Sequence, residues 1–162
     1  TFFELGENAT AHPELTRAVL KRGHALASHT WDHADMTTLS ASALQNEISH
    51  TSDVLGKIAG RELTCLRPPY GAVNDTVKAA IAGNDLTMWL WDIDPQDWNR
   101  PGVSAIVSNV LSNAHPGAVN LMHDGGGDRS NTVKALREVL PKLKEKGFTF
   151  DTIPVCRPLG HE

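Results

Sequence analysis

The first 28 residues, "TFFELGENATAHPELTRAVLKRGHALAS" (1–28), have the pattern of a strand, a helix and a second strand. Two short apolar runs, Phe2–Leu5 and His24–Ser28, have the length of strands. Between them, Pro13 suits the first position of a helix and Gly23 suits the residue that follows it. A strand, a helix and a second strand in this order predict two parallel strands joined by a crossover helix.

The same alternation continues along the chain. Further strand candidates are Leu63–Leu66, Leu86–Trp91, Ala118–Met122 and Phe148–Ile153. Helical patterns lie between them, and their expected capping or first residues are Ser40, Asn74, Ser104 and either Ser130 or Asn131. Gly60 and Gly83 are expected to end two of these helices, and Pro141 is expected to kink or break the last. Six strands alternating with helices predict one parallel α/β domain over residues 1–162.

Composition narrows the possible functions. The chain has 162 residues, of which 40% are hydrophobic, so it can bury a core without cross-links. Its net charge of −4 and the absence of a basic stripe argue against nucleic acid as a partner. No apolar run approaches the length that spans a membrane. Cys65 and Cys156 can pair in an oxidising compartment, but buried free thiols are the favoured interpretation.

Polar clusters follow four of the predicted strands. They are the pair His29 and His33, "RPPYG" (67–71), "DIDPQDW" (92–98) and "HDGGGDRS" (123–130). In parallel α/β folds the carboxyl ends of the strands share one side, where the chemistry collects. We therefore expect the four clusters to converge on one cleft.

The histidine pair suits a metal. His29 and His33 are four residues apart, so both imidazoles can point to one place, and neutral imidazole binds zinc at ~2.0–2.1 Å. A catalytic zinc needs a third protein ligand, and spacing alone identifies no carboxylate for that position. The alternative is that one histidine is a hydrogen-bonded surface residue and the other only supports its surroundings. The neighbouring polar clusters favour the metal.

The "RPPYG" loop has two possible roles. Two prolines stiffen it, so an exposed amide can donate to an oxyanion, and Arg67 can orient a carboxylate through paired hydrogen bonds. A structural turn with a surface arginine is the alternative.

The two later clusters offer acid–base chemistry. Asp92, Asp94 and Asp97 can bind metal, set the pKa of a histidine, or cap the next loop. Trp98 can stack on a sugar or belong to the core. His123 can protonate a leaving group. The glycines that follow His123 lack the spacing of a nucleotide-binding loop, so nucleotide binding is rejected.

Taken together, these clusters resemble the polysaccharide deacetylases of carbohydrate esterase family four. The resemblance covers nearly the whole chain: residues 1–33 are similar to the family's strand, helix and metal-histidine region. "RPPYG", "DIDPQDW" and "LMHDGGG" (121–127) are similar to its third, fourth and fifth motifs, in order. The resemblance implies a distorted (β/α) barrel of seven to eight strands. Only about six are expected here, because a "TFDDG"-like motif in the family's first βα unit would precede these residues.

The resemblance also implies roles for residues in the first half of the chain. His29 and His33 would bind a divalent metal, zinc or cobalt. The third ligand and the catalytic base would be aspartates of the "TFDDG"-like motif. Arg67 would hold that base in place, and the backbone amide of Tyr70 would help to form the oxyanion hole.

In the second half, Asp94 would tune His123, which would act as the general acid. Leu121 and Trp98 would line the pocket for the acetyl methyl group. The implied reaction is metal-dependent hydrolytic deacetylation of an N-acetylglucosamine polymer, such as chitin or peptidoglycan, or of acetylxylan.

Two alternatives are a non-catalytic glycan-binding protein and, less favoured, a small domain with a structural zinc. The resemblance implies an extracellular or cell-envelope location, with an acetylated polysaccharide or oligosaccharide as partner. The chain's own N-terminal fragment is a second expected partner. Without it, we expect weak zinc binding and essentially no turnover.

Overall fold

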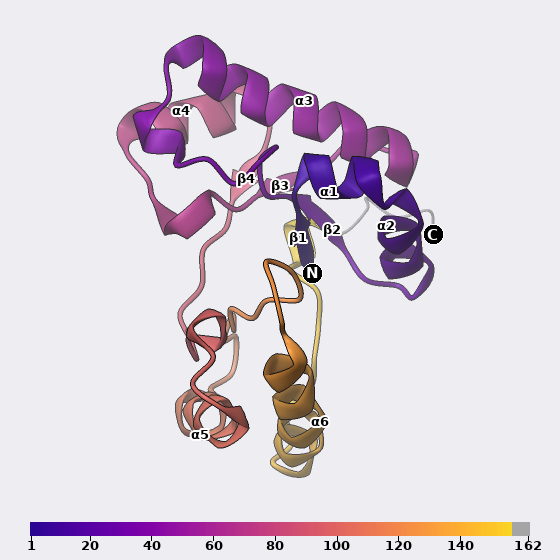
Figure 1. The fold of residues 1–162 in the computed structure, drawn as a ribbon, viewed down its shortest axis with the longest axis vertical. Coiled ribbons are helices and arrows are strands. Elements are labelled where there is room, and N and C mark those ends of the chain that lie inside the picture. The colour runs from indigo at the N-terminus through magenta and orange to yellow at the C-terminus, as the bar shows by residue number, and fades with distance from the viewer. Residues whose placement is uncertain (157–162) are drawn as a thin grey trace. The chain divides into compact units, whose positions relative to one another are not determined.

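A computed structural model describes residues 1–156 as two compact units, a division that the sequence did not predict. Of the described residues, the first unit comprises Thr1–Leu90 and residues 151–156, and the second comprises Trp91–Phe150. Figure 1 shows the elements of each unit, which are described separately below.

The first unit is built on a parallel sheet. Its strands are β1 (Phe2–Glu4), β2 (Leu26–Ser28), β3 (Cys65–Leu66) and β4 (Thr87–Met88), in the order β1-β2-β3-β4. All three strand pairs are parallel, and the register places Phe3 beside Ala27 and Cys65 beside Thr87. The predicted parallel α/β fold is therefore confirmed, and its first four strands lie within the predicted ranges.

Helices connect these strands. They are α1 (Gly6–Ala11), α2 (Pro13–Lys21), α3 (Ala41–Ala59) and α4 (Asp75–Gly83). The predicted caps form, because Ser40 accepts a hydrogen bond from the Ala43 amide (3.3 Å) and Asn74 accepts one from the Val77 amide (2.9 Å). Gly60 ends α3 in the left-handed conformation, with φ 69°. The sequence did not predict α1, a six-residue helix that begins at a glycine without a side-chain cap.

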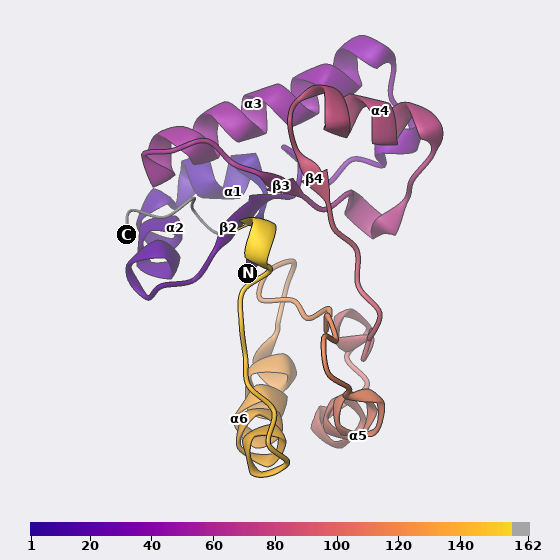
Figure 2. The same cartoon turned by 180° about the vertical axis from the view of Figure 1, so that it is seen from behind.

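The helices cover one face of the sheet, as Figures 1 and 2 show for α1, α3 and α4. Leu26 and Leu66 point to this face. They pack in one cluster with helical side chains that include Ala9, Leu44, Ile48, Leu55, Val77 and Ile81. Since successive side chains of a strand point to opposite faces, the neighbours of Leu26 and Leu66 face the other way.

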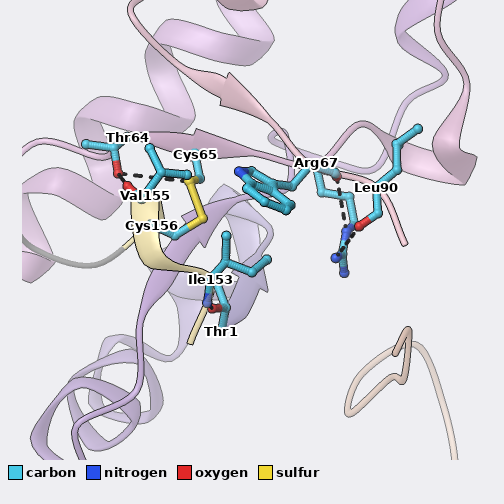
Figure 3. The surroundings of a disulfide bond; sticks show 9 residues. Thr1, Thr64, Cys65, Arg67, Leu90, Ile153, Val155 and Cys156 are labelled. Carbon is cyan, nitrogen blue, oxygen red and sulfur yellow. Dashed lines mark hydrogen bonds between the residues drawn. A yellow bond between two sulfur atoms is a disulfide. The ribbon is translucent and has the colours of Figure 1, made fainter. Parts of the chain in front are cut away.

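The opposite face is covered by the returning chain. Ala25, Ala27 and Cys65 form a second buried cluster with Cys156, and Cys156 belongs to the short 3-10 helix η4 (Pro154–Cys156). Cys65 and Cys156 form a disulfide, with their Cα atoms 5.3 Å apart (Figure 3). The favoured interpretation of free thiols was wrong. The two residues are 91 positions apart, and only the return of the chain to the sheet brings them together.

Hydrogen bonds hold the same segment on both sides of the disulfide. Thr64 donates to the Val155 carbonyl (2.6 Å), and the Ile153 amide donates to the Thr1 hydroxyl (2.8 Å), as Figure 3 shows. The sixth predicted strand, Phe148–Ile153, was wrong, since the structure assigns no strand to those residues. The Ile153 amide bonds to a side chain instead of a strand, and Pro154, which follows it, has no N–H to donate to a ladder.

The second unit contains α5 (Val103–Asn113), α6 (Ser130–Glu145) and the 3-10 turn η3 (Asp97–Asn99). The two helices pack through Ile106, Val107, Val110, Ala135, Val139 and Leu143. α6 continues through Pro141. Of the two predicted effects of this proline, the break was wrong, and the kink stays a prediction. The fifth predicted strand is reduced to one parallel bridge between Ile93 and Asn120. None of the described helices is long and apolar enough to cross a membrane.

We predict that reducing the disulfide destabilises the first unit. The bond joins residues 91 positions apart. A disulfide typically contributes about 2–4 kcal/mol to the free energy of unfolding. Thermal and urea unfolding of the protein with and without dithiothreitol should show this loss, and Cys156→Ser should reproduce it without reductant. A Cys65→Ser/Cys156→Ser double variant should not respond to reductant. Equal melting temperatures for oxidised and reduced protein would contradict the prediction.

Candidate catalytic site

The histidine loop follows β2 and has an unusual backbone. Thr30 and His33 both have positive φ, 68° and 70°, and the Thr30 residue is fully buried. A β-branched residue rarely adopts this conformation, so surrounding contacts must hold it. α3 supplies two such contacts to Trp31, since Glu47 accepts a hydrogen bond from its amide (2.7 Å) and the His50 ring lies 4.2 Å from its ring, centroid to centroid.

His29 has a defined tautomer. Its Nδ1 atom lies 2.6 Å from the Arg67 carbonyl oxygen. A carbonyl can only accept a hydrogen bond, so Nδ1 carries the hydrogen and Nε2 keeps the lone pair that a metal requires. The His33 ring lies 4.9 Å from the His29 ring, and the Tyr70 ring lies 4.6 Å from the His33 ring. The structure thus brings together the four predicted site residues of the first unit.

The two histidines do not complete a metal centre. Among residues 1–156, no three His, Cys, Asp or Glu side chains are grouped closely enough to hold a metal ion. A catalytic zinc takes three protein ligands, so the described residues fit two positions of that set and leave the third unassigned. The assignment of His29 and His33 as ligands stays a prediction.

Arg67 is held in the interior of the first unit. It donates to the carbonyls of Trp89 (3.3 Å) and Leu90 (3.0 Å), and its guanidinium carbon lies 4.0 Å from the centre of the Phe3 ring. Burial lowers the pKa of Arg67 to about 10, so the side chain remains charged at neutral pH. A buried, oriented cation is suited to its predicted role, which was to hold a carboxylate base.

The "RPPYG" loop forms a 3-10 turn, η2 (Pro69–Gly71). Tyr70 has φ 59° and ψ 2° within it, and its residue is 68% exposed. The Gly71 and Ala72 amides donate to the carbonyls of Pro68 (3.2 Å) and Pro69 (3.0 Å), which stiffens the turn. The oxyanion role of the Tyr70 amide stays a prediction.

In the second unit, His123 is bonded to Asp97. The His123 Nδ1 atom lies 2.7 Å from one Asp97 carboxylate oxygen, and the His123 amide donates to the other (2.9 Å). Thr132, in the first turn of α6, also donates to that second oxygen (2.7 Å). Burial raises the pKa of Asp97, but the hydrogen bonds from His123 and Thr132 outweigh it, so the net pKa is lowered. An ionised Asp97 keeps the hydrogen on Nδ1, which leaves Nε2 to exchange a proton with a substrate.

The sequence assigned this contact to Asp94, and the structure shows Asp97 in that place. The Asp94 carboxylate accepts a hydrogen bond from the Gln96 amide (2.7 Å) and forms a local turn. Gln96 has φ 53°, and this left-handed residue turns the chain between the two aspartates. Spacing could not identify this turn in advance. Asp92 is used elsewhere, accepting from the Val119 amide (2.6 Å) and lying 2.9 Å from His115 Nε2.

The two predicted pocket residues belong to the same unit as His123. Trp98 directly follows Asp97 and is 50% exposed. Leu121 is buried, and its amide donates to the Ile93 carbonyl (2.8 Å) beside the parallel bridge. Their roles around an acetyl methyl group stay predictions, and so does the convergence of all four clusters on one cleft.

A histidine pair and a carboxylate–histidine pair in a protein with a parallel α/β fold are typical of hydrolytic enzymes. The model of the polysaccharide deacetylase family matches residues 1–89. The chain belongs to this family.

Individual proteins similar to this chain are deacetylases as well. A peptidoglycan-N-acetylglucosamine deacetylase of Bacillus cereus is 41% identical over 155 residues, covering 94% of this chain and 72% of that protein. A chitooligosaccharide deacetylase of Rhizobium leguminosarum bv. trifolii is 36% identical over 165 residues, covering 95% and 77%. The solved structure of the peptidoglycan N-acetylglucosamine deacetylase Bc1960 superposes with a TM-score of 0.91 at 32% identity, covering 99% of this chain and 76% of that one.

We predict that Asp97→Asn destabilises the protein and that Asp94→Asn does not. Asp97 accepts three hydrogen bonds in a buried place, and a bond to a charged group contributes about 1.5–3 kcal/mol. Asp94 is half-buried and accepts one hydrogen bond, within its own turn, so Asp94→Asn should change the free energy of unfolding by less than about 0.5 kcal/mol. Urea unfolding at pH 7 measures both variants, and equal effects would contradict the assignment.

The difference between wild type and Asp97→Asn should also depend on pH. Because the pKa of Asp97 is lowered in the fold, its stabilisation is fully present above the unfolded pKa, ~3.9, and is lost as the pH falls through the folded value. Urea unfolding of both proteins from pH 7 down to pH 2.5 should show the gap narrow only at the acidic end. A constant gap over that range would contradict this.

Proposed function

We propose that this protein hydrolyses the acetamide group of N-acetylglucosamine residues in a glycan. The single observation that carries the proposal is the buried Asp97 carboxylate bonded to His123 Nδ1 at 2.7 Å. The names of the relatives support it, because one deacetylates N-acetylglucosamine in peptidoglycan and another acts on chitooligosaccharides.

In this proposal His123 is the general acid. Breaking the C–N bond of an acetamide leaves an amine that must take up a proton. His123 delivers it from Nε2, since Nδ1 is engaged by Asp97. The Asp97 carboxylate stabilises the imidazolium before the transfer and keeps the ring oriented, and Thr132 holds the carboxylate itself.

We extend the proposal to a divalent metal at His29 and His33, zinc or cobalt, whose third ligand the described residues do not supply. A bound metal would polarise the acetyl carbonyl and lower the pKa of a water. The Nδ1 bond to the Arg67 carbonyl supports this, because it directs the His29 lone pair outward from Nε2. Arg67 and the Tyr70 amide keep their proposed roles with the base and the oxyanion.

The disulfide supports a location outside the cytoplasm. Disulfides persist in oxidising compartments, and that between Cys65 and Cys156 is buried in the core of the first unit. An extracellular or cell-envelope protein would also meet the glycans that the named relatives act on.

The metal assignment predicts that His29→Ala removes zinc binding. Losing one of two imidazole ligands should weaken the zinc affinity by at least about 100-fold. Isothermal titration calorimetry with zinc measures this, and His12→Ala, which changes an exposed histidine outside the loop, serves as the control. Unchanged affinity in His29→Ala would rule out the assignment.

The catalytic assignment predicts that His123→Ala suppresses deacetylation while zinc affinity stays within a factor of two. A general acid contributes about 10²–10⁴-fold to the rate. Acetate release from an N-acetylglucosamine pentamer is measured with the chain alone and with a "TFDDG"-like βα unit fused before Thr1. We expect turnover in the fused protein, and His123→Ala made in that protein should remove it.

A fused protein that binds the pentamer without releasing acetate would instead favour a non-catalytic glycan-binding protein. Full activity of His123→Ala would show that another group is the acid.

A further inference from the structure

Arg129, the residue before α6, joins two separate segments of the second unit. Its Nε donates to the Gly125 carbonyl (2.7 Å) and its Nη2 to the Gly126 carbonyl (3.0 Å). Its Nη1 donates to the Trp98 carbonyl (3.2 Å), 31 residues earlier in the chain. A guanidinium is planar and offers its donors in a fixed fork, so three such bonds fix the relative position of the three carbonyls.

Two of the glycines after His123 lie close to the guanidinium groups of arginines. Gly126 and Gly127 have φ 75° and 114°, which side chains disfavour. A Cβ at Gly126 would lie 3.3 Å from Arg129 Nη2, and one at Gly127 would lie 2.9 Å from Arg100 Nη2. The loop therefore needs glycine at these two positions for its backbone, and the missing side chains leave room for the two arginines.

The turn that carries Trp98 needs support from outside. Gln96 and Arg100 flank η3, and both have φ 53°, a conformation that costs a non-glycine residue about 1–3 kcal/mol. Hydrogen bonds from His123 and Thr132 hold Asp97 at the start of the turn. The carbonyl of the next residue, Trp98, is held by Arg129. The Trp98 residue is 50% exposed, so packing restrains its ring less than it would restrain a buried ring.

We propose that Arg129 is a positioning residue for glycan binding, which holds Trp98 and the 125–127 loop as one sugar-contacting edge next to the Asp97–His123 pair. An aromatic face packs against the apolar face of a sugar only if the ring is held in the right orientation. The inference rests on the proposed function, because it takes an N-acetylglucosamine oligomer as the ligand. Arg129 reaches that ligand only through the carbonyls that it fixes.

The first test is spectroscopic and needs no substrate. The protein is labelled with 5-fluorotryptophan, and the resonance of Trp98 is assigned from Trp98→Phe. Arg129→Ala should shift or broaden the Trp98 resonance and leave those of Trp31 and Trp89, in the first unit, in place. Arg137→Ala, which removes an exposed arginine two turns further along α6, should change none of them. An unchanged Trp98 resonance in Arg129→Ala would overturn the inference.

The second test is binding of an N-acetylglucosamine pentamer, measured by calorimetry. Arg129→Ala should weaken it about tenfold, as expected when a preorganised contact is lost. Arg129→Lys should also bind the pentamer more weakly than wild type, since lysine keeps the charge but lacks the fixed, forked donors of a guanidinium. Arg137→Ala should bind like wild type. Wild-type affinity in Arg129→Ala or in Arg129→Lys would overturn the inference.

These results separate the inference from the proposed function. If wild type does not bind the pentamer, the proposed function fails, and the fluorine spectrum alone decides whether Arg129 positions Trp98. If wild type binds and Arg129→Ala binds equally well, only the inference fails. If Arg129→Ala does not fold, as judged by its melting curve, both measurements are made on Arg129→Lys, which should show the same changes in smaller degree.

Discussion

The first unit depends on one constraint: a parallel sheet has apolar side chains on both faces, so other parts of the chain must cover both faces. α1, α3 and α4 cover the face that Leu26 and Leu66 present. The other face carries the small side chains of Ala25 and Ala27 beside Cys65, which leaves room for the chain to return. η4 fills that room and is held there by the disulfide. The position of β3, from which the Arg67 loop departs, is therefore secured from both sides.

The same hydrogen-bonding arrangement occurs separately in each unit. An oxygen that can only accept, the Arg67 carbonyl in one unit and the ionised Asp97 carboxylate in the other, binds Nδ1 of a histidine. In both cases the hydrogen is fixed on Nδ1, and Nε2 is left for chemistry. For His29 this suits a metal, and for His123 it suits proton transfer. The same kind of contact thus suits one histidine to metal binding and the other to proton transfer.

Most of the strained backbone conformations, those with positive φ at a non-glycine residue, lie in the predicted polar clusters or near them. Among residues 1–156, six non-glycine residues have positive φ, and all but Asp85 lie in or directly beside the predicted clusters: Thr30, His33, Tyr70, Gln96 and Arg100. Such conformations persist only where neighbouring contacts hold them. Glu47 and His50 hold the histidine loop, and His123 and Arg129 hold the η3 turn. These supporting residues come from helices and loops far away in sequence.

Sequence alone was enough to predict the parallel α/β fold, the caps at Ser40 and Asn74 and the motifs of the family, because periodicity, capping and motif spacing are local properties. It could not choose Asp97 over Asp94, since that choice depends on a left-handed turn at Gln96 and on Thr132 from a later helix. Nor could it show that Cys65 pairs with Cys156, or that the chain after the last predicted strand packs against the sheet. Those outcomes were decided by the tertiary structure, because each depends on which distant groups compete for the same hydrogen bond or the same buried face.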